Sequence, residues 1–318
     1  MDVRQLRYFV RIAELGSVSA ASHRLGVAQP SLSQHIKHLE QELGVDLLIR
    51  SSRGVSLTDS GQILLSHATS IVNAVDVAVT EIKDRSGEVR GSVSIGVPSS
   101  AGNVLSVPLA ETVCHQFPKV MLRTMEAMSG HVQEWLAQGQ IDLGILYNID
   151  HVRHLRTQPL LVEELFLVAA ADGWHGKVGS NGIADKSVSL RECADLGLIL
   201  PHRTHGLRET IERFASSQKV HLNVIIEMDS LTNIKALVAR GSGYSILAHA
   251  AVVEEIQRAT LVIIPIREPV MRRTVFLVRN PSRPLTEATR EIEGLIKEIV
   301  TELVRKRLWL GQLCSSYT

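Results

Sequence analysis

Apolar positions near the N-terminus recur with the period of a helix and are interrupted by short polar breaks. The first helical stripe ends near Gly16, and Ser17 and Gly26, typical cap residues, bound a second helix expected over 18–25. A third helix is expected to start around Gln29 to Ser31, because Pro30 is tolerated in a first helical turn. The apolar positions that define the first and third helices are Leu6, Phe9, Val10, Ala13, Leu32, Ile36, Leu39 and Leu43.

The second and third helices are separated by a short turn that contains glycine. This arrangement is typical of a helix-turn-helix, whose second helix enters the major groove of DNA, and we expect it over about 18–37. The segment 47–57 alternates around a polar turn and predicts a two-stranded wing, with Arg50 and Arg53 directed at phosphates. The outer face of the third helix is polar and almost free of acid, although a merely solvated face is the alternative; it consists of Gln29, Ser31, Ser33, Gln34, His35, Lys37 and His38.

A longer apolar repeat follows the wing. Its members are separated by four and three residues in alternation, which is the a/d pattern of a coiled coil, here about three heptads long. We expect one helix that pairs with its copy in a second subunit, the alternative being a helix that lies on its own domain. The stretch 85–91 breaks the pattern and is interpreted as a hinge. The repeat consists of Leu64, Ala68, Ile71, Val75, Ala78 and Ile82.

Beyond the hinge, strand-like apolar runs alternate with helical ones. This alternation predicts an α/β fold with a mainly parallel sheet covered by helices on both faces. The last strand is expected over 274–278, and a helix is expected from Thr286 to about Arg305. The earlier runs lie at 93–97, 107–117, 120–125, 131–137, 141–146, 165–169, 196–200, 224–228, 244–247 and 261–264.

Composition narrows the classes of protein that remain. A chain of 318 residues is expected to hold two or three domains, and 45% hydrophobic with 21% charged residues indicates a globular protein. Aromatic residues make up 4%, too few for a platform that stacks single-stranded nucleic acid. The formal net charge of +1 does not suit a nonspecific DNA-packaging protein, so DNA binding must rest on local arrangement. Without a secretory signal pattern or an apolar run of about 18 residues, we expect a cytoplasmic protein that does not bind membranes.

Candidate catalytic and metal-binding chemistry is sparse. The chain shows no nucleophile elbow, phosphate-binding loop or zinc-protease motif, so we expect no enzyme, no catalytic residue and no cofactor. Two histidine pairs, His151 with His154 and His202 with His205, could share an ion but lack a third ligand at suitable spacing, so no metal site is expected. The cysteines are interpreted as reduced thiols, with a paired-thiol redox switch as the alternative; they are Cys114, Cys193 and Cys314.

The first sixty residues resemble the LysR-type transcriptional regulators, and the resemblance extends over nearly the whole chain. Within that family the chain is most similar to the nitrogen assimilation control subgroup, through the segments 27–34, 47–50, 91–96, 143–147 and 158–161. Many members carry Ser where Ala28 stands and a cation where Gln34 stands, so base preferences are not carried over. The family pattern appears as Leu6-Arg7-Tyr8-Phe9, Gly16-Ser17, Ala20-Ala21, Leu25, Gln29-Pro30-Ser31-Leu32-Ser33, Ile36, Leu39-Glu40, Leu43-Gly44, Leu47-Leu48, Arg50, Arg53, Leu57-Thr58 and Gly61.

The resemblance implies a dimer, or a tetramer of two dimers, on a partly palindromic promoter site, with RNA polymerase as a further partner. It implies contacts to bases or backbone from Gln29, Pro30, Ser33, Gln34 and Lys37, with Arg50 and Arg53 at the wing. We add Ser31 and His35 to the candidate DNA-binding residues because they share the polar face of the third helix. Among these residues, Gln29 suits the two-point amide recognition of adenine.

The resemblance also implies that the C-terminal part is like a periplasmic binding protein, with two α/β lobes and an effector cleft between them. One lobe maps to 92–163 with 267–305 and the other to 164–266. In such folds anions bind at the carboxyl ends of strands and at helix N-termini, which favours a small organic anion. Simple helix capping is the alternative for the serines. The matching candidate residues are Ser99, Ser100, Ser129, Tyr147, His202 and Thr204.

The sequence therefore predicts three parts. These are a winged helix-turn-helix over 1–60, a dimerising linker helix and hinge over 61–88, and a two-lobed α/β regulatory domain over 89–318. The function we expect is sequence-specific DNA binding by a transcription regulator. The rival hypothesis is a small-molecule binding protein or a binding-fold enzyme in which the N-terminal domain is an accessory.

Overall fold

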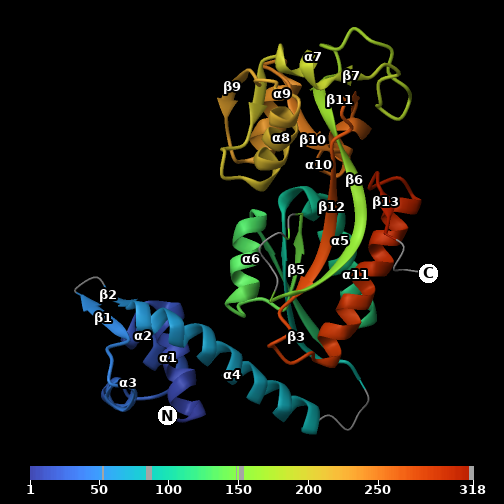
Figure 1. Cartoon of the computed structure of the whole chain (residues 1–318). Coiled ribbons are helices and arrows are strands. Elements are labelled where there is room, and N and C mark those ends of the chain that lie inside the picture. The colour runs from blue at the N-terminus through green and yellow to red at the C-terminus, as the bar shows by residue number, and fades with distance from the viewer. Residues whose placement is uncertain (52–53, 84–87, 148, 150–153, 315–318) are drawn as a thin grey trace.

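The computed structural model describes residues 1–51, 54–83, 88–147, 149 and 154–314. A small helical unit and a long helix lie beside two stacked α/β lobes (Figure 1). This architecture confirms the predicted fold class. No helix in the described ranges is long and apolar enough to cross a membrane.

The N-terminal unit has the elements that the apolar pattern predicts. Its helices are α1 (Val3–Leu15), α2 (Val18–Leu25) and α3 (Gln29–Leu43), and its wing consists of β1 (Leu48–Ser51) and β2 (Gly54–Leu57). Ser17 caps α2 by accepting a hydrogen bond from the backbone N–H of Ala20, and Gly26 ends the helix in the left-handed conformation. The core between the three helices contains Leu6, Phe9, Ile12, Ala21, Leu32, Ile36 and Leu39, all buried.

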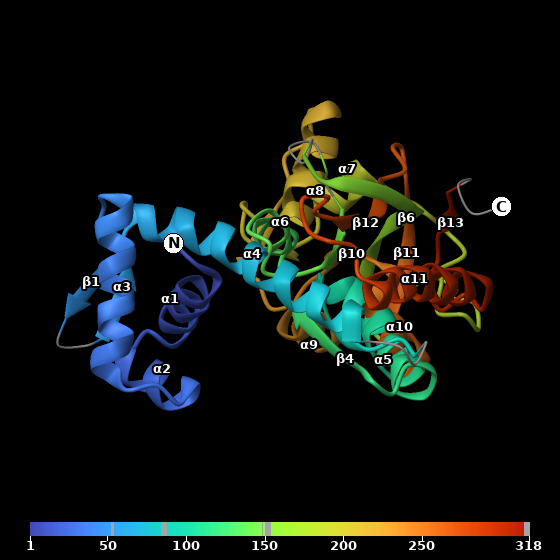
Figure 2. The ribbon, with the colours of Figure 1, turned by 90° about the horizontal axis from the view of Figure 1, so that it is seen from below.

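Helix α4 (Asp59–Lys83) leaves this unit and runs toward the first lobe (Figures 1 and 2). Its first half packs on α1, where Ala68 and Val72 are buried in the core of the N-terminal unit. Arg7 of α1 donates two hydrogen bonds of 3.0 and 2.7 Å to the carboxylate of Asp76. The N-terminal unit therefore forms one packed body with the adjoining part of α4.

The first lobe is built on three parallel strands. These are β3 (Gly91–Val97), β4 (Val120–Glu126) and β5 (Leu143–Leu146), with β3 between the other two. Helices α5 (Ser99–Gln116) and α11 (Glu287–Arg305) pack on one face of the sheet, and α6 (Ser129–Ala137) packs on the other. Figure 1 shows these helices on opposite sides of the strands.

The second lobe has its own apolar core. Its parallel strands β8 and β9 pair with each other, and a parallel bridge from Leu198 to Tyr244 brings the start of β10 alongside. The elements of this lobe are β7 (Val188–Ser189), α7 (Leu190–Ala194), β8 (Leu198–Leu200), α8 (Gly206–Ser217), β9 (Val224–Glu227), α9 (Leu231–Ala239), β10 (Ser245–Ala248), α10 (His249–Gln257) and β11 (Leu261–Arg267).

Two long strands connect the lobes. Strand β6 (Arg156–Ala170) pairs with β12 (Arg272–Arg279) and β13 (Gln312–Leu313) in the first lobe and with β10 and β11 in the second, always antiparallel. The expectation of a mainly parallel sheet is therefore right for β3, β4 and β5 but wrong for the crossover. The reason is that one continuous strand serves both lobes, so the strands returning beside it run against it.

Candidate functional site

Most of the predicted DNA-binding residues line one groove between α3 and the wing. The groove has a volume of about 690 Å³, and Glu40 braces its base by accepting hydrogen bonds from the backbone N–H groups of Leu47 and Leu48 at 3.0 and 3.3 Å. Helix α3 and strand β1 are therefore held at a fixed spacing. The lining residues include Pro30, Ser33, Gln34, Lys37, Gln41 and Arg50.

The first turn of α3 is exposed and lacks a side-chain cap. Ala28 occupies the N-cap position, and no side chain accepts a hydrogen bond from the first backbone N–H groups. Such N–H groups, together with the positive end of the helix dipole, suit a phosphate oxygen. Gln29 and Ser31 are exposed on the same turn. This end of α3 can therefore meet a DNA backbone while its side chains reach base edges.

The two histidines of α3 also have partners inside the N-terminal unit. The ring of His35 is half-buried and meets Tyr8 of α1 edge-on, with ring centroids 5.2 Å apart. His38 Nδ1 lies 3.1 Å from Gln5 Nε2. Packing against α1 thus gives both rings a structural role, and contact of His35 with DNA stays a prediction. Arg53 lies outside the described residues.

The apolar repeat of α4 divides between two surroundings. Leu64 and Ala68 face the core of the N-terminal unit, as the alternative reading of this helix expected. Ile71 is 40% exposed, Ala78 is exposed and Val75 is half-buried. The backbone of Ile82 belongs to α4, whereas its side chain lies outside the described part. The half of the repeat that remains open is available to a partner.

Between the lobes, Ser100 and Tyr147 come together with an arginine of β12. The hydroxyls of Ser100 and Tyr147 lie 2.6 Å apart, and Arg273 Nη2 donates to Ser100 Oγ at 3.3 Å. The Arg273 guanidinium stands 3.5 Å from the centroid of the Tyr147 ring, a cation–π contact. Burial raises the pKa of Tyr147 to about 12 even though Arg273 lowers it, so the phenol is neutral and available for hydrogen bonding.

A buried carboxylate neutralises this arginine. Arg273 Nε donates to Glu163 Oε1 at 2.7 Å, and the indole N–H of Trp309 donates to Glu163 Oε2 at 2.7 Å. Glu163 and Trp309 are 1% and 0% exposed. Both oxygens of the carboxylate are thus satisfied inside the protein, as a buried charge requires.

A cavity of about 240 Å³ opens beside Tyr147 and Arg273. Arg272 is paired with Glu164 at 2.9 Å, whereas Arg213 of α8 forms no ion pair with another described residue. The walls are partly apolar, so the cavity combines excess positive charge with a surface for carbon atoms. Its lining consists of Tyr147, Ile149, Val162, Arg213, Arg272, Arg273, Thr274 and Phe276.

The predicted serines begin helices without capping them. Pro98 precedes α5 and Met128 precedes α6, and neither helix start has a side-chain hydrogen bond to its backbone. Ser99 and Ser129 are half-buried first residues of these helices. Simple capping, the alternative reading, therefore does not account for them.

His202 and Thr204 lie in the second lobe, after β8, and both are exposed. His202 Nδ1 lies 3.2 Å from Thr204 Oγ1, and the His202 backbone N–H donates to Asp229 Oδ1 at 2.9 Å. The next histidine, His205, has its pKa lowered by burial; Asp229 raises it and Arg273 lowers it.

The cysteines are unpaired and differ in environment. Cys114 is exposed, Cys193 is buried and Cys314 is half-buried. Burial raises the pKa of Cys193 to about 12, which leaves almost no reactive thiolate near neutral pH. Within the described ranges no group of three or more metal-ligating side chains occurs. His151 lies outside those ranges.

Sequence reasoning missed the most buried members of the cleft. Glu163, Arg273 and Trp309 are far apart in the chain, and an isolated charge is ordinarily interpreted as a surface residue. A usable signal was available for Arg273, which directly precedes the apolar run expected as a strand over 274–278. Arg213 offered no signal, because it lies on the outward side of an amphipathic helix.

Comparison with known proteins agrees with this architecture. Residues 3–62 match the bacterial regulatory helix-turn-helix of the lysR family, and residues 86–300 match the LysR substrate binding domain. The chain is 31% identical to the nitrogen assimilation regulatory protein nac of Escherichia coli over 97% of its length and 99% of that protein. It is 34% identical to the nac protein of Klebsiella aerogenes over 79% of each chain. A full-length OxyR structure from Pseudomonas aeruginosa covers 100% of this chain and 99% of its own, with a TM-score of 0.77 and 22% identity.

A winged helix-turn-helix joined to a two-lobed binding domain defines a DNA-binding regulator that carries an effector-binding domain. The chain belongs to the LysR family of transcription regulators, whose members are not enzymes. The identity to the two nac proteins confirms the resemblance to the nitrogen assimilation subgroup, and membership of the family removes the rival hypothesis of a binding-fold enzyme.

Proposed function

We propose that the protein binds promoter DNA as a dimer or tetramer through paired α3 helices, and that a small organic anion in the inter-lobe cleft modulates this binding. At the promoter, RNA polymerase is the proposed partner. The observation that carries the DNA part is the groove between α3 and the wing, which gathers Ser33, Gln34, Lys37 and Arg50 beside an uncapped helix start. Hydrogen-bonding groups for bases and cations for phosphates lie there on one surface.

The exposed apolar side of α4 supports the dimer. Ile71 is 40% exposed, Val75 is half-buried and Ala78 is exposed, and their spacing of four and three residues places them on one side of the helix. A second copy of α4 would cover these side chains and would present two α3 helices to successive major grooves.

The charge of the cleft supports an organic anion. Three arginines line the cavity of about 240 Å³, and two of them are balanced by glutamates, which leaves Arg213 as an excess positive charge. The apolar side chains of Ile149, Val162 and Phe276 favour an anion that carries a hydrocarbon part over an inorganic ion.

The DNA proposal is tested by selection from the protein's own genome. Sheared genomic DNA is incubated with the purified full-length protein at two salt concentrations, and the bound fragments are sequenced and footprinted. We expect a defined protected site of about two to five helical turns and a large preference over random DNA at both salt concentrations. Recovery of fragments without a common site would overturn the proposal. Thermal-shift screening of organic acids, repeated with Arg213→Ala, tests the cleft.

A further inference from the structure

Helix α6 begins at the cleft. Ser129 opens it directly after β4, and the last residues of β4 and β3, Glu126 and Val97, lie opposite each other in register. The backbone N–H of Ala127 donates to Val97 O at 3.2 Å. The start of α6 therefore lies at the same sheet edge as the start of α5 and the residue Tyr147, which follows β5.

The body of α6 is packed into the cleft wall. A Cβ placed on Gly144 would lie 2.8 Å from methyl carbons of both Val132 and Leu136, so the helix rests directly on the strand backbone. The same apolar cluster includes Ile149 and Phe276, which also line the cleft cavity. A displacement of that wall is therefore transmitted to α6 through side chains that are already in contact.

The end of α6 contacts α4. Asn280 Nδ2 donates to Leu136 O at 3.0 Å, and Gly139 makes the turn after the helix with φ +66°. Ser66 Oγ of α4 donates to Gln138 O at 3.4 Å. A Cβ placed on Gly139 would lie 2.9 Å from Ser70 Oγ, so α4 lies against this turn without an intervening side chain. We call the contact of Ser66 and Ser70 with 138–139 the α6–α4 joint.

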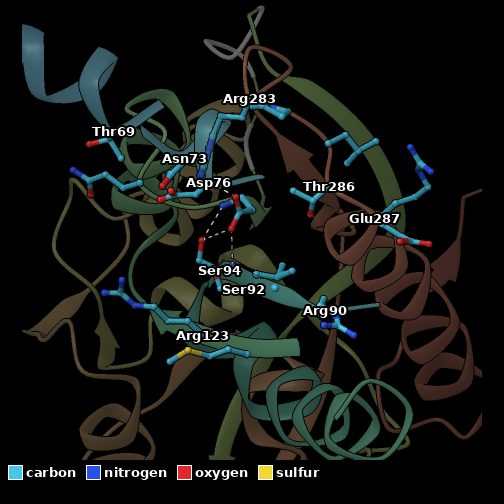
Figure 3. A pocket seen from close by; sticks show the side chains of 18 of the residues that line it. Thr69, Asn73, Asp76, Arg90, Ser92, Ser94, Arg123, Arg283, Thr286 and Glu287 are labelled. Carbon is cyan, nitrogen blue, oxygen red and sulfur yellow. Dashed lines mark hydrogen bonds and ion pairs between the residues drawn. The ribbon is translucent and has the colours of Figure 1, made fainter. Parts of the chain in front are cut away.

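An open polar cavity of about 760 Å³ adjoins this joint. Thr69 and Asn73 of α4 line one side and Ser92 and Ser94 the other (Figure 3). Arg283 lies beside the joint and is paired with Asp142 at 2.9 Å. The cavity separates neighbouring parts of α4 and the first lobe, whereas at the joint the two are in direct contact.

Beyond the joint, α4 leads into the N-terminal unit, which carries α3 and which we call the DNA-reading unit. Ala68 and Val72 lie on α4 between and just after the two serines, and both are buried against α1 in the core that holds α3. The nine residues of α6 span about 14 Å at 1.5 Å per residue. One rigid helix thus connects a cleft wall to the body that carries α3.

We infer that α6 couples the effector cleft to the DNA-reading unit of the same chain through the α6–α4 joint. This inference rests on the proposed function of the cleft and adds the route by which its occupancy acts on DNA binding. A shift of the cleft wall moves α6, the joint moves with it, and α4 changes the placement of α3.

Hydrogen exchange of the full-length protein tests the route without DNA or ligand. Phe276→Ala removes a side chain shared by the cleft wall and the α6 cluster. Its matched control, Val113→Ala, trims a buried side chain on the opposite face of the same sheet. We expect Phe276→Ala to raise exchange about threefold or more in both 129–139 and 62–75, and Val113→Ala to leave 62–75 unchanged. Faster exchange in 129–139 alone overturns the route; Phe276→Leu replaces the alanine variant if that variant fails to fold.

DNA binding tests whether the route reaches α3. Ser70→Leu replaces the hydroxyl that lies against the turn at Gly139 with a larger side chain and opens the joint, whereas Ser70→Ala only removes that oxygen and leaves it closed. On the genomic site selected above, we expect Phe276→Ala to change affinity about threefold or more, less than about 1.5-fold in the Ser70→Leu background, and again about threefold in the Ser70→Ala background. An equal effect in all three backgrounds overturns the inference. If the unaltered protein selects no site, the proposed function fails, while the exchange experiment still decides the route.

Discussion

Arg273 and Glu163 face each other across the two crossover strands and form an ion pair of 2.7 Å, with side chains 4% and 1% exposed. Removing the cation leaves a buried carboxylate with only the Trp309 N–H as partner. We expect Arg273→Met to lower the free energy of unfolding by about 3–5 kcal/mol. Arg272→Met breaks the neighbouring ion pair with Glu164. Because Arg272 is 60% exposed, this change is expected to lower the free energy of unfolding by less than about 1 kcal/mol. Urea denaturation of both variants measures the difference, and equal losses would contradict the buried role of Arg273.

Gln29 is expected to read a base. Its exposed amide on the first turn of α3 can make two hydrogen bonds to adenine, so Gln29→Ala should reduce the preference for the selected site by about 1–3 kcal/mol while changing affinity for random DNA little. Lys37→Ala is the comparison. As a phosphate contact, it should weaken both affinities alike and lower the salt slope by about one. Fluorescence anisotropy with both DNAs decides between base reading and simple charge, and equal losses for Gln29→Ala would exclude the first.

Ile71 is expected to lie in the dimer interface. Ile71→Asp places a charge on the exposed apolar side of α4, and the desolvation of that carboxylate in a dimer should give monomers at micromolar concentration. Gln62→Asp introduces the same charge at an exposed polar position of α4 and should leave the assembly intact. Sedimentation velocity measures both. An unchanged sedimentation coefficient for Ile71→Asp would remove α4 from the interface.

His249 is expected to make stability depend on pH. It opens α10 with 6% exposure, its Nδ1 has no partner among the described residues, and burial lowers its pKa to about 4. As the pH falls, His249 in the unfolded chain binds a proton near its ordinary pKa of 6.5, whereas in the folded chain it stays neutral until the pH approaches about 4. Stability that is present above pH 6.5 is therefore lost as the pH falls toward about 4.

Between pH 7.5 and 5.5 this histidine should cost about 1.4 kcal/mol of unfolding free energy. His249→Leu should reduce the loss by that amount, measured by urea denaturation at both pH values. A variant whose stability falls as steeply as that of the unaltered chain would show that His249 is protonated in the folded state.

Cys114 is expected to be the reactive thiol. Its side chain is exposed, whereas the raised pKa of the buried Cys193 suppresses its thiolate. Brief iodoacetamide treatment of the native protein, followed by mass spectrometry, should label Cys114 well before Cys193. Peroxide should leave site-specific DNA binding unchanged in the unaltered protein and in Cys193→Ser. Loss of binding restricted to the unaltered protein would restore the redox-switch alternative.

Local signals predicted the N-terminal unit well because its boundaries are set by neighbouring residues. Ser17 and Gly26 bound α2 at the residues expected, and Thr286 caps α11 where the sequence predicted that helix to begin. The rule that ligands bind at strand ends also brought two candidates together. Ser100 and Tyr147 were both expected in the cleft, and in the structure their hydroxyls are in hydrogen-bond contact.

Other features depend on contacts that no local pattern encodes. The apolar run at 165–169 marked only a third of β6, because residues 156–164 are polar at both ends and show no alternation, and their partner strand begins about a hundred residues later. The α4 repeat identified the apolar side chains but not the surface that covers them. In the structure α1 covers Leu64 and Ala68. Glu163 and Arg273 are buried only because each neutralises the other, a relationship visible only in three dimensions.

The continuity of β6 has a consequence for limited digestion. The chain enters the second lobe along β6 and returns through β11 and β12, so that lobe is an insertion held at both of its ends. A protease that cleaves one surface loop within 171–260 should nick the protein without releasing a fragment, since both halves stay hydrogen-bonded in the same sheet. Detaching the second lobe would require severing both connections.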